Sequence, residues 1–292
     1  MLKIDKLKKY PIIYIIGHKN MDADTIISSY LLSKILNNFG IRSEYAKLED
    51  DYEIVFDDYD LIKDFLGEKY NPTTIKNTEI SNNYFILVDH NNPIQSIGDI
   101  NRVVGIVDHH FTDNNNTNCL ISNYASTSSF IYDMYKDVYQ FSKHDKLLVF
   151  LAILSDTAYL KTTRFKEKDK KMLEILNNEL NLDHNELREK YFRTNEFDKG
   201  IEINFHSNYK QYKFENIEFE SSFIRANSLD KYRLNDYINY LKSVPNNWLL
   251  IWYEYDKDKT YVYFKHNNEI KEFEYDFIAS RANDIVKEII KL

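Results

Sequence analysis

The sequence predicts an α/β fold in which an N-terminal domain with a mostly parallel sheet, flanked by helices, precedes a smaller α+β domain. Two observations predict the first domain. Apolar runs of strand length recur at residues 12–16, 84–88 and 103–107, and a segment of helical periodicity follows the first of them at 25–38. Continuous apolar runs are typical of strands buried on both faces of a parallel sheet. The third observation, alternation of apolar and polar residues within 209–266, predicts the second sheet.

The expected elements of the first domain follow in chain order. The helix at 25–38 places its apolar residues on one side and has Gly40 as a stop signal. The remaining elements are short strands at 42–45 and 52–56, a helix at 60–66, an apolar stretch at 147–154, and helices at 167–179 and 185–192, the last with Asp183 as its N-cap.

The second domain is expected to contain four strands and two helices. Helical periodicity stops at the polar residues 193–199, which indicates a linker. The strands are expected at 209–214, 218–225, 248–255 and 260–266, and the helices near 229–241 and at the C-terminus. We therefore predict a first domain at 1–190, a linker at 191–200 and a second domain at 201–292.

Asp and His residues follow four of the apolar runs. Open parallel sheets bind ligands beyond the carboxyl ends of their strands, so these residues should meet at one edge. Each cluster alone has a structural explanation, because Asp after a strand often caps a helix and a lone His often packs in a core. The four together predict a shared metal site. They are His18, Asp22 and Asp24; Asp89-His90-Asn91; Asp108-His109-His110; and Ser155-Asp156-Thr157.

The charges of this cluster indicate which metals would bind. The carboxylates of Asp22, Asp24, Asp89 and Asp156 carry four negative charges, which two divalent cations would offset. Carboxylate and imidazole ligands suit Mn²⁺, Mg²⁺ or Co²⁺. A structural zinc site made of thiolates is excluded because Cys119 is the only cysteine.

Two features beside the cluster have a possible role in it. Gly17 either lets the backbone approach the metals closely or simply turns the chain. The N-terminus of the helix at 25–38 should face the metal site, where its amides and positive dipole would favour phosphate.

The motifs carrying these residues resemble those of the DHH phosphoesterases and, within them, the manganese-dependent (family II) inorganic pyrophosphatases. Residues 17–24 resemble the GHxNPDxD motif, 88–91 the VDHN motif and 107–110 the DHH triplet. The small residues at 125–129 resemble the helix start that follows the triplet, and 155–157 resemble the SDT motif. The motifs keep the family's order across residues 12–160.

The resemblance implies a role for each site residue. His18 and Asp22 would bind one metal, and Asp24, His109 and Asp156 the other. Asp89 would bridge the two ions. Asp108 would orient a histidine ligand, and His110 would contact substrate phosphate, so that Asp89, His110 and Asp108 form the catalytic set. The implied cofactor is two divalent ions, Mn²⁺ first, with Co²⁺ or Mg²⁺ as alternatives. The implied activity is hydrolysis of inorganic pyrophosphate to two phosphates by a two-metal-activated water.

The second domain is expected to supply cations to the substrate. Residues 277–281 resemble the strand that ends in the SRKK motif, and 209–212 resemble the lysine-bearing DxKEF segment. Arg281 and Lys210 would therefore bind phosphate from a lid domain. No GGGH signature is present, which argues against the branch of the family that cuts short oligonucleotides and cyclic dinucleotides.

Three departures from the family motifs leave the substrate open. Ala282 stands where SRKK has a second basic residue, Asn92 where an acidic residue follows VDHN, and Met21 where the first motif has proline. One alternative is an exopolyphosphatase of the same superfamily, although such proteins commonly have Asn at the position of His18. Another is a catalytically weak phosphate- or nucleotide-binding protein.

Composition excludes several other classes of function. The net charge is −8, with no basic block interleaved with aromatic residues, so duplex nucleic acid is not an expected partner. No segment approaches the eighteen apolar residues or so of a membrane span. With one cysteine and no signal sequence, we expect a cytoplasmic protein acting on a small phosphate substrate. The abundant aromatic residues would fit either cores or a homodimer interface. The lysines at 161–171 indicate a solvated face or a steering patch.

Overall fold

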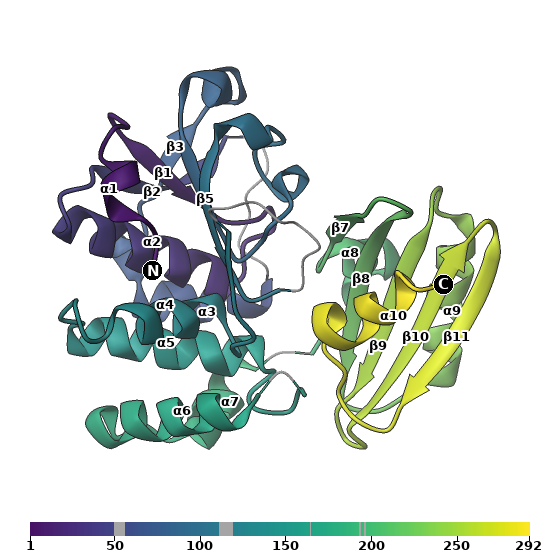
Figure 1. Ribbon diagram of the computed structural model, residues 1–292. Coiled ribbons are helices and arrows are strands. Elements are labelled where there is room, and N and C mark those ends of the chain that lie inside the picture. The colour runs from purple at the N-terminus through teal and green to yellow at the C-terminus, as the bar shows by residue number, and fades with distance from the viewer. Residues whose placement is uncertain (50–55, 111–118, 164, 193, 196) are drawn as a thin grey trace. The chain divides into compact units, whose positions relative to one another are not determined.

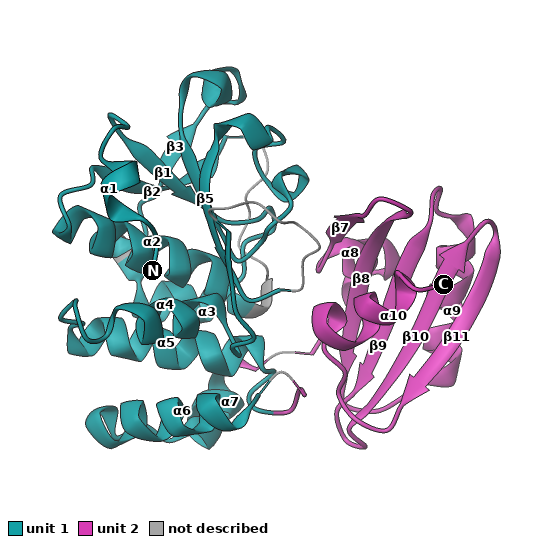
Figure 2. Cartoon of the chain, viewed as in Figure 1, with its two compact units in different colours: residues 1–160, 164–191 teal, residues 161–163, 192–292 magenta. Residues whose placement is uncertain are grey.

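The computed structural model describes residues 1–49, 56–110, 119–163, 165–192, 194–195 and 197–292. The chain divides into two compact units, shown in Figure 2. Unit 1 comprises residues 1–160 and 164–191, and unit 2 comprises 161–163 and 192–292. The segment 161–163 belongs to unit 2, where Thr162 forms a parallel bridge with Ile278. The predicted domains at 1–190 and 201–292 stay a prediction.

Unit 1 contains a six-stranded, fully parallel sheet with the order β3-β2-β1-β4-β5-β6. Four of its strands, β1, β2, β3 and β5, are labelled in Figure 1. The chain runs from β1 outward to β2 and β3 and then returns to β4 on the other side of β1. The carboxyl ends of β1 and β4 therefore form the crevice in which α/β sheets bind ligands. The strands are β1 Ile13–Ile16, β2 Ser43–Leu48, β3 Thr73–Ile75, β4 Phe85–Val88, β5 Val103–Asp108 and β6 Cys119–Ile121.

The helices of unit 1 confirm most of the predicted pattern. Helix α2 packs against β1, β2, α4 and α5, and α5 packs against α6. The helices are α1 Ile4–Leu7, α2 Ala23–Asn38, α3 Phe56–Phe65, α4 Thr127–Tyr135, α5 Lys143–Asp156, α6 Glu167–Leu180 and α7 His184–Tyr191. Short 3-10 helices lie at Gly67–Lys69, Asn77–Asn82, Pro93–Gln95 and Ile100–Arg102.

One apolar run differs from the other three that end in site residues. Residues 147–154 lie in helix α5, whereas the other runs are strands. Every residue from 148 to 154 is buried because α2, α4 and α6 all pack against this helix. An apolar run does not distinguish a buried helix from a buried strand. The strand expected at 52–56 lies mostly outside the described residues, and Phe56 begins α3.

Unit 2 contains a five-stranded sheet with the order β11-β10-β9-β8-β7. The β8–β9 pair is parallel, and helix α9 (Lys231–Ser243) connects its strands; the other pairs are antiparallel. This mixed sheet confirms the α+β prediction. The strands are β7 Lys210–Lys213, β8 Glu218–Ala226, β9 Trp248–Glu254, β10 Lys259–His266 and β11 Glu269–Tyr275.

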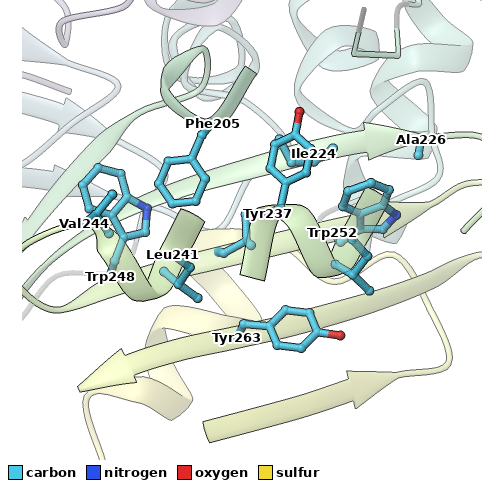
Figure 3. Close-up of a cluster of buried hydrophobic side chains, with 11 residues drawn as sticks. Phe205, Ile224, Ala226, Tyr237, Leu241, Val244, Trp248, Trp252 and Tyr263 are labelled. Atoms are coloured by element: carbon cyan, nitrogen blue, oxygen red, sulfur yellow. The ribbon is translucent and has the colours of Figure 1, made fainter. Parts of the chain in front are cut away.

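Three parts of unit 2 differ from the sequence prediction. Strand β11 and helix α8 (Ile201–His206), which follows a 3-10 turn at Phe197–Lys199, were not expected. The prediction of a strand at 277–281 is wrong, because this segment makes only one isolated bridge among the described residues. Arg281 begins a π-helical segment, Arg281–Val286, which leads into α10 (Lys287–Ile289). Aromatic residues from α8, α9 and β9 fill the core shown in Figure 3.

Among the described residues, no helix combines the length and the apolar character that crossing a bilayer requires.

Candidate metal centre

The ligand-bearing segments meet where the sheet of unit 1 reverses its strand order. His18 follows β1, Asp89 follows β4, and His109 follows β5. Asp22 is the N-cap of α2, and its side chain accepts a hydrogen bond from the Thr25 amide at 2.9 Å. These ligand residues are far apart in sequence but close in space, because adjacent parallel strands end at the same edge of the sheet.

One group of donor atoms consists of His18, Asp22 and Asp89. The His18 Nε2 atom lies 3.3 Å from Asp22 Oδ2 and 3.3 Å from Asp89 Oδ2. The donor atoms of the three residues all lie within 4.8 Å of one another, which is compatible with one metal ion.

A second group consists of Asp24, Asp89, His109 and Asp156. The His109 Nε2 atom lies 3.2 Å from Asp89 Oδ1, 3.2 Å from Asp156 Oδ2 and 4.0 Å from Asp24 Oδ2. Asp156 is the last residue of α5 and Asp24 lies in the first turn of α2, so a helix end, a helix start and two strand ends supply this group. Asp89 offers a different carboxylate oxygen to each group. The structure thus brings together all six predicted ligands.

The imidazole rings are oriented as metal ligands require. The Nδ1 atom of His18 lies 2.7 Å from the Lys19 carbonyl, and that of His109 lies 3.1 Å from the Tyr124 carbonyl. Because a carbonyl can only accept, each Nδ1 carries a proton and donates it, so Nε2 faces the carboxylates, where a metal ion would replace its proton. Carboxylate oxygens with neutral imidazoles fit Mn²⁺ and similar cations.

Hydroxyl groups hold the shared carboxylate of Asp89. Thr25 Oγ1 donates to Asp89 Oδ2 at 2.7 Å, and Thr127 Oγ1 donates to Asp89 Oδ1 at 3.3 Å. Asp89 also has a positive φ of 60°, which is uncommon for a residue other than glycine. Neither threonine was among the predicted site residues, although both stand at the starts of helices beside the ligand motifs.

The N-terminus of α4 binds the carboxylate of Asp24. The amides of Thr127 and Ser128 donate to its two oxygens at 2.6 and 2.8 Å. These amides have no partner within the helix, and the helix dipole favours the negative charge. At the start of α2, the amides of Ala23 and Thr25 donate to Asp58 and Asp22, so they already have protein acceptors rather than facing a phosphate.

Gly17 is required by a close contact with α2. A Cβ atom at this position would lie 2.0 Å from the Thr25 Cγ2 atom. The backbone of Gly17 does approach a neighbour closely, as one prediction had it. The neighbour is the methyl group of Thr25, whose hydroxyl donates to Asp89, and not a metal ligand.

Burial and neighbouring charge shift the pKa values of the carboxyl groups in opposite directions. Burial, with the nearby carboxylates of Asp89 and Asp156, raises the pKa of Asp24 well above its ordinary value. Burial also acts to raise the pKa of Asp89, but hydrogen bonds from His109 and His18 outweigh it and hold this pKa well below its ordinary value. Carboxyl groups this close share protons unless cations are present.

Asp108 orients the side chain of His110 instead of a predicted ligand histidine. Its Oδ1 atom lies 2.8 Å from His110 Nδ1 and also accepts the backbone amides of His109 and His110. Its Oδ2 atom accepts from Asn91 Nδ2 at 2.6 Å. The ring of His109 is not available to Asp108 because its Nδ1 faces the Tyr124 carbonyl. The role expected for Asp108 is corrected accordingly.

His90 uses both ring nitrogens within the protein. Nδ1 faces the Val88 carbonyl at 2.8 Å, and Nε2 faces Ser96 Oγ at 2.7 Å. Burial, together with the nearby His18, lowers the pKa of His90 to about 4. This histidine of the second motif is therefore a neutral structural residue.

The two phosphate-binding residues predicted in unit 2, Arg281 and Lys210, both neighbour Ser221. Arg281 Nη1 donates to the Asn208 carbonyl at 2.6 Å and lies 3.5 Å from Ser221 Oγ, while its guanidinium packs over the ring of Phe223. Lys210 pairs with Ser221 in the β7–β8 ladder.

Three of the lysines at 161–171 contact other side chains within their own units. Lys161 pairs with Asp258 at 2.8 Å, Lys170 pairs with Glu167 at 3.6 Å, and Lys168 lies over the ring of Tyr124. Arg164 lies outside the described residues.

Comparison with solved structures supports the fold of the whole chain. A Methanococcus jannaschii protein named a "putative family II inorganic pyrophosphatase" superposes with a TM-score of 0.77 at 19% identity, covering 96% of this chain and 98% of that one. An "exopolyphosphatase-related protein" from Bacteroides fragilis superposes with a TM-score of 0.51 at 16% identity, covering 89% and 82%. At these identities the likeness is one of fold.

Curated relatives match part of the chain. A "Probable manganese-dependent inorganic pyrophosphatase" of Lactobacillus helveticus is 33% identical over 182 residues, covering 59% of this chain and 56% of the relative. A protein of the same name from Clostridium acetobutylicum is 28% identical over 210 residues, covering 69% and 66%. The matched region thus spans roughly half to two thirds of the length of these relatives.

A family comparison covers the metal centre. Residues 12–160 match the family described as "DHH family, N-terminal domain". This region contains all six candidate ligands, from His18 to Asp156, and amounts to half of the chain. The resemblance seen in the motifs is therefore confirmed, and the chain belongs to the DHH family.

Proposed function

We propose that this protein is a metal-dependent hydrolase of phosphoanhydride bonds that converts inorganic pyrophosphate to two phosphates. The observation that carries the proposal is the position of Asp89, whose two oxygens face two separate groups of donor atoms. The names of the curated relatives, manganese-dependent inorganic pyrophosphatases, support the same reaction and metal.

The proposed cofactor is a pair of Mn²⁺ ions. His18, Asp22 and Asp89 would hold one ion, and Asp24, Asp89, His109 and Asp156 the other, as the two donor groups suggest. The four carboxylates carry four negative charges, which two divalent ions would neutralise. Bound divalent cations supply Lewis acidity toward phosphoryl oxygens and lower the pKa of a water nucleophile.

His110 is the proposed proton donor to substrate. Its hydrogen bond with Asp108 fixes the ring and stabilises a positive charge on it, so the opposite nitrogen, Nε2, would contact phosphate. When that nitrogen carries a proton it can donate to a phosphoryl oxygen or to the leaving phosphate.

Arg281 and Lys210 are the proposed phosphate contacts in unit 2. The packing of Arg281 over Phe223 and its bond to the Asn208 carbonyl limit the orientations of the guanidinium, which favours a fixed phosphate contact. Ala282 is buried and offers no side-chain donor where the resembling motif has a second basic residue. Because the phosphate-binding group has one cation fewer than the motif implies, an exopolyphosphatase is the second candidate. A catalytically weak phosphate-binding protein is the third.

The test is phosphate release from four substrates by the full-length protein. Pyrophosphate, tripolyphosphate, long-chain polyphosphate and a dinucleotide are each supplied with Mn²⁺ and, in parallel, with EDTA. We expect pyrophosphate to be the best substrate and EDTA to abolish turnover. Preference for long chains would establish the second candidate instead, and turnover of none would favour the binding protein.

A further inference from the structure

A carboxylate outside the six-ligand set connects two of the ligand-bearing segments. Asp58, on helix α3, is only 7% exposed. Its Oδ2 atom accepts the backbone amide of Ala23 at 2.9 Å, and its Oδ1 atom accepts the Ser155 hydroxyl at 2.6 Å. Ala23 stands between Asp22 and Asp24, and Ser155 directly precedes Asp156.

We propose that Asp58 is a positioning residue that fixes the spacing between Asp24 and Asp156, and so sets the metal affinity of the group containing both. The inference rests on the proposed metal-binding function. Asp58 is 35 residues from Ala23 and 97 from Ser155 in sequence. Its two oxygens therefore join segments that the covalent chain leaves far apart.

Both contacts lie where helices need external partners. Ala23 is the first residue of α2, and its amide is among those with no acceptor inside the helix. Ser155 and Asp156 are the last two residues of α5, where helices tend to fray. Asp58 thus restrains the start of one helix and the end of another with a single side chain. An ion held by both helices needs such a restraint, because ligand atoms displaced by tenths of an ångström bind poorly.

The two donor groups should respond differently to the loss of this contact. Asp24 and Asp156 both belong to the group with Asp89 and His109. The other group takes only Asp22 from the segments that Asp58 joins. Loss of the Asp58 carboxylate should therefore weaken the binding of one ion more than that of the other.

The experiment measures Mn²⁺ binding to the full-length, EDTA-stripped protein by isothermal titration calorimetry. In Asp58→Ala, one ion should bind about 10- to 100-fold more weakly, the usual effect of removing a partner that orients metal ligands. Asp58→Asn should recover most of the affinity, because its amide can accept from Ala23 and donate to Ser155. Ser155→Ala, which leaves Asp58 in place, should weaken the same ion to a smaller extent.

Asp64→Ala is the matched control on the same helix. Asp64 accepts the Tyr191 hydroxyl at 2.7 Å and pairs with Lys190 at 3.0 Å, so it ties α3 to α7 without contacting a ligand segment. Its loss should leave Mn²⁺ binding unchanged. Comparison with this variant separates positioning from a general loss of stability.

The possible outcomes separate this inference from the proposed function. Wild-type Mn²⁺ affinity in Asp58→Ala would overturn the inference while leaving the metal centre intact. If Asp58→Asn binds Mn²⁺ no better than Asp58→Ala, the inference is also overturned. The negative charge of Asp58 would then matter, and not its two hydrogen bonds. If Asp58→Ala fails to fold, unchanged affinity in Ser155→Ala would count against the inference. Absence of Mn²⁺ binding by the wild type would refute the proposed function itself.

Discussion

The two units of this protein bury charged groups in different ways. In unit 2, the buried carboxylate of Glu254 accepts from Lys257 Nζ, the Leu229 amide and the Tyr261 hydroxyl, all within 3.1 Å. In unit 1, three carboxylates, those of Asp24, Asp89 and Asp156, lie within 4.0 Å of the single Nε2 atom of His109. The buried charge of Glu254 is thus satisfied by groups of unit 2 itself, whereas unit 1 gathers like charges that need cations.

The two units also differ in the kinds of side chains that they bury. Large aromatic residues, among them Phe205, Tyr237, Trp248 and Trp252, dominate the core of unit 2 (Figure 3). In unit 1, the buried polar residues His18, Asp89 and His109 lie beyond the carboxyl ends of the strands. The stability of unit 1 should therefore depend on its cations, and that of unit 2 on packing.

The largest expected effect is that of Asp89→Ala on activity. This change removes a ligand from both donor groups. If each loss weakens its site about 100-fold and the two multiply, turnover of pyrophosphate with Mn²⁺ falls about 10⁴-fold. Initial rates of phosphate release measure it, with the exposed Asp137→Ala as the control. Full activity in Asp89→Ala would disprove the shared role of this residue.

Adding Mn²⁺ should stabilise unit 1 selectively. A ligand at about 1,000 times its dissociation constant contributes about 4 kcal/mol for each site. Amide hydrogen exchange, measured by mass spectrometry with Mn²⁺ and with EDTA, can resolve both units. We expect added protection in β1, β4 and α2 and little change in β9 and β10. Equal protection of both units would show that unit 1 does not depend on cations more than unit 2 does.

Trp252→Ala should destabilise unit 2 without affecting the candidate metal centre of unit 1. Trp252 is fully buried on β9, stacked on Phe197 and in contact with the edge of Tyr237. Removing such a side chain costs about 3–5 kcal/mol of stability in a packed core. Denaturant unfolding and Mn²⁺ titration together test this. Unit 2 should be destabilised while Mn²⁺ affinity stays at the wild-type value, and a large loss of affinity would show that the two regions are coupled.

The smallest effect is expected for Thr25→Val. This change keeps the shape of the side chain but removes the hydroxyl that donates to Asp89 Oδ2. Mn²⁺ affinity should fall about tenfold, the lower end for such partners, because Thr127 still donates to the other oxygen. Thr25→Ser keeps the hydroxyl and is the matched control. Calorimetric titration measures both affinities. Equal Mn²⁺ affinity in Thr25→Val and Thr25→Ser would show that the Thr25 hydroxyl does not contribute to metal binding.

Several strands and helices could be predicted because their signal is local. The runs at 12–16, 84–88 and 103–107 are apolar enough to mark buried parallel strands, and they became β1, β4 and β5. Strand β3, with three residues, is too short to carry a period. Strand β11 was missed because most of its residues are exposed and charged at an edge of the sheet.

The sequence by itself determined which residues would come together in the candidate metal centre. Asp and His at the ends of apolar runs are a local pattern, and β-strands in a parallel sheet bring such ends to one edge. The ordered motifs also determined the family. For both, the chemistry of a few residue types at fixed positions was enough.

Only the tertiary structure decided how those residues are held. The bonds from Thr25 and Thr127 to Asp89 and the two contacts of Asp58 depend on where whole helices pack. Nothing local to Asp58 distinguishes it from Asp57 and Asp60 on the same helix. Hydrogen bonds are directional and act over about 3 Å, so their partners follow from three-dimensional packing and not from sequence spacing.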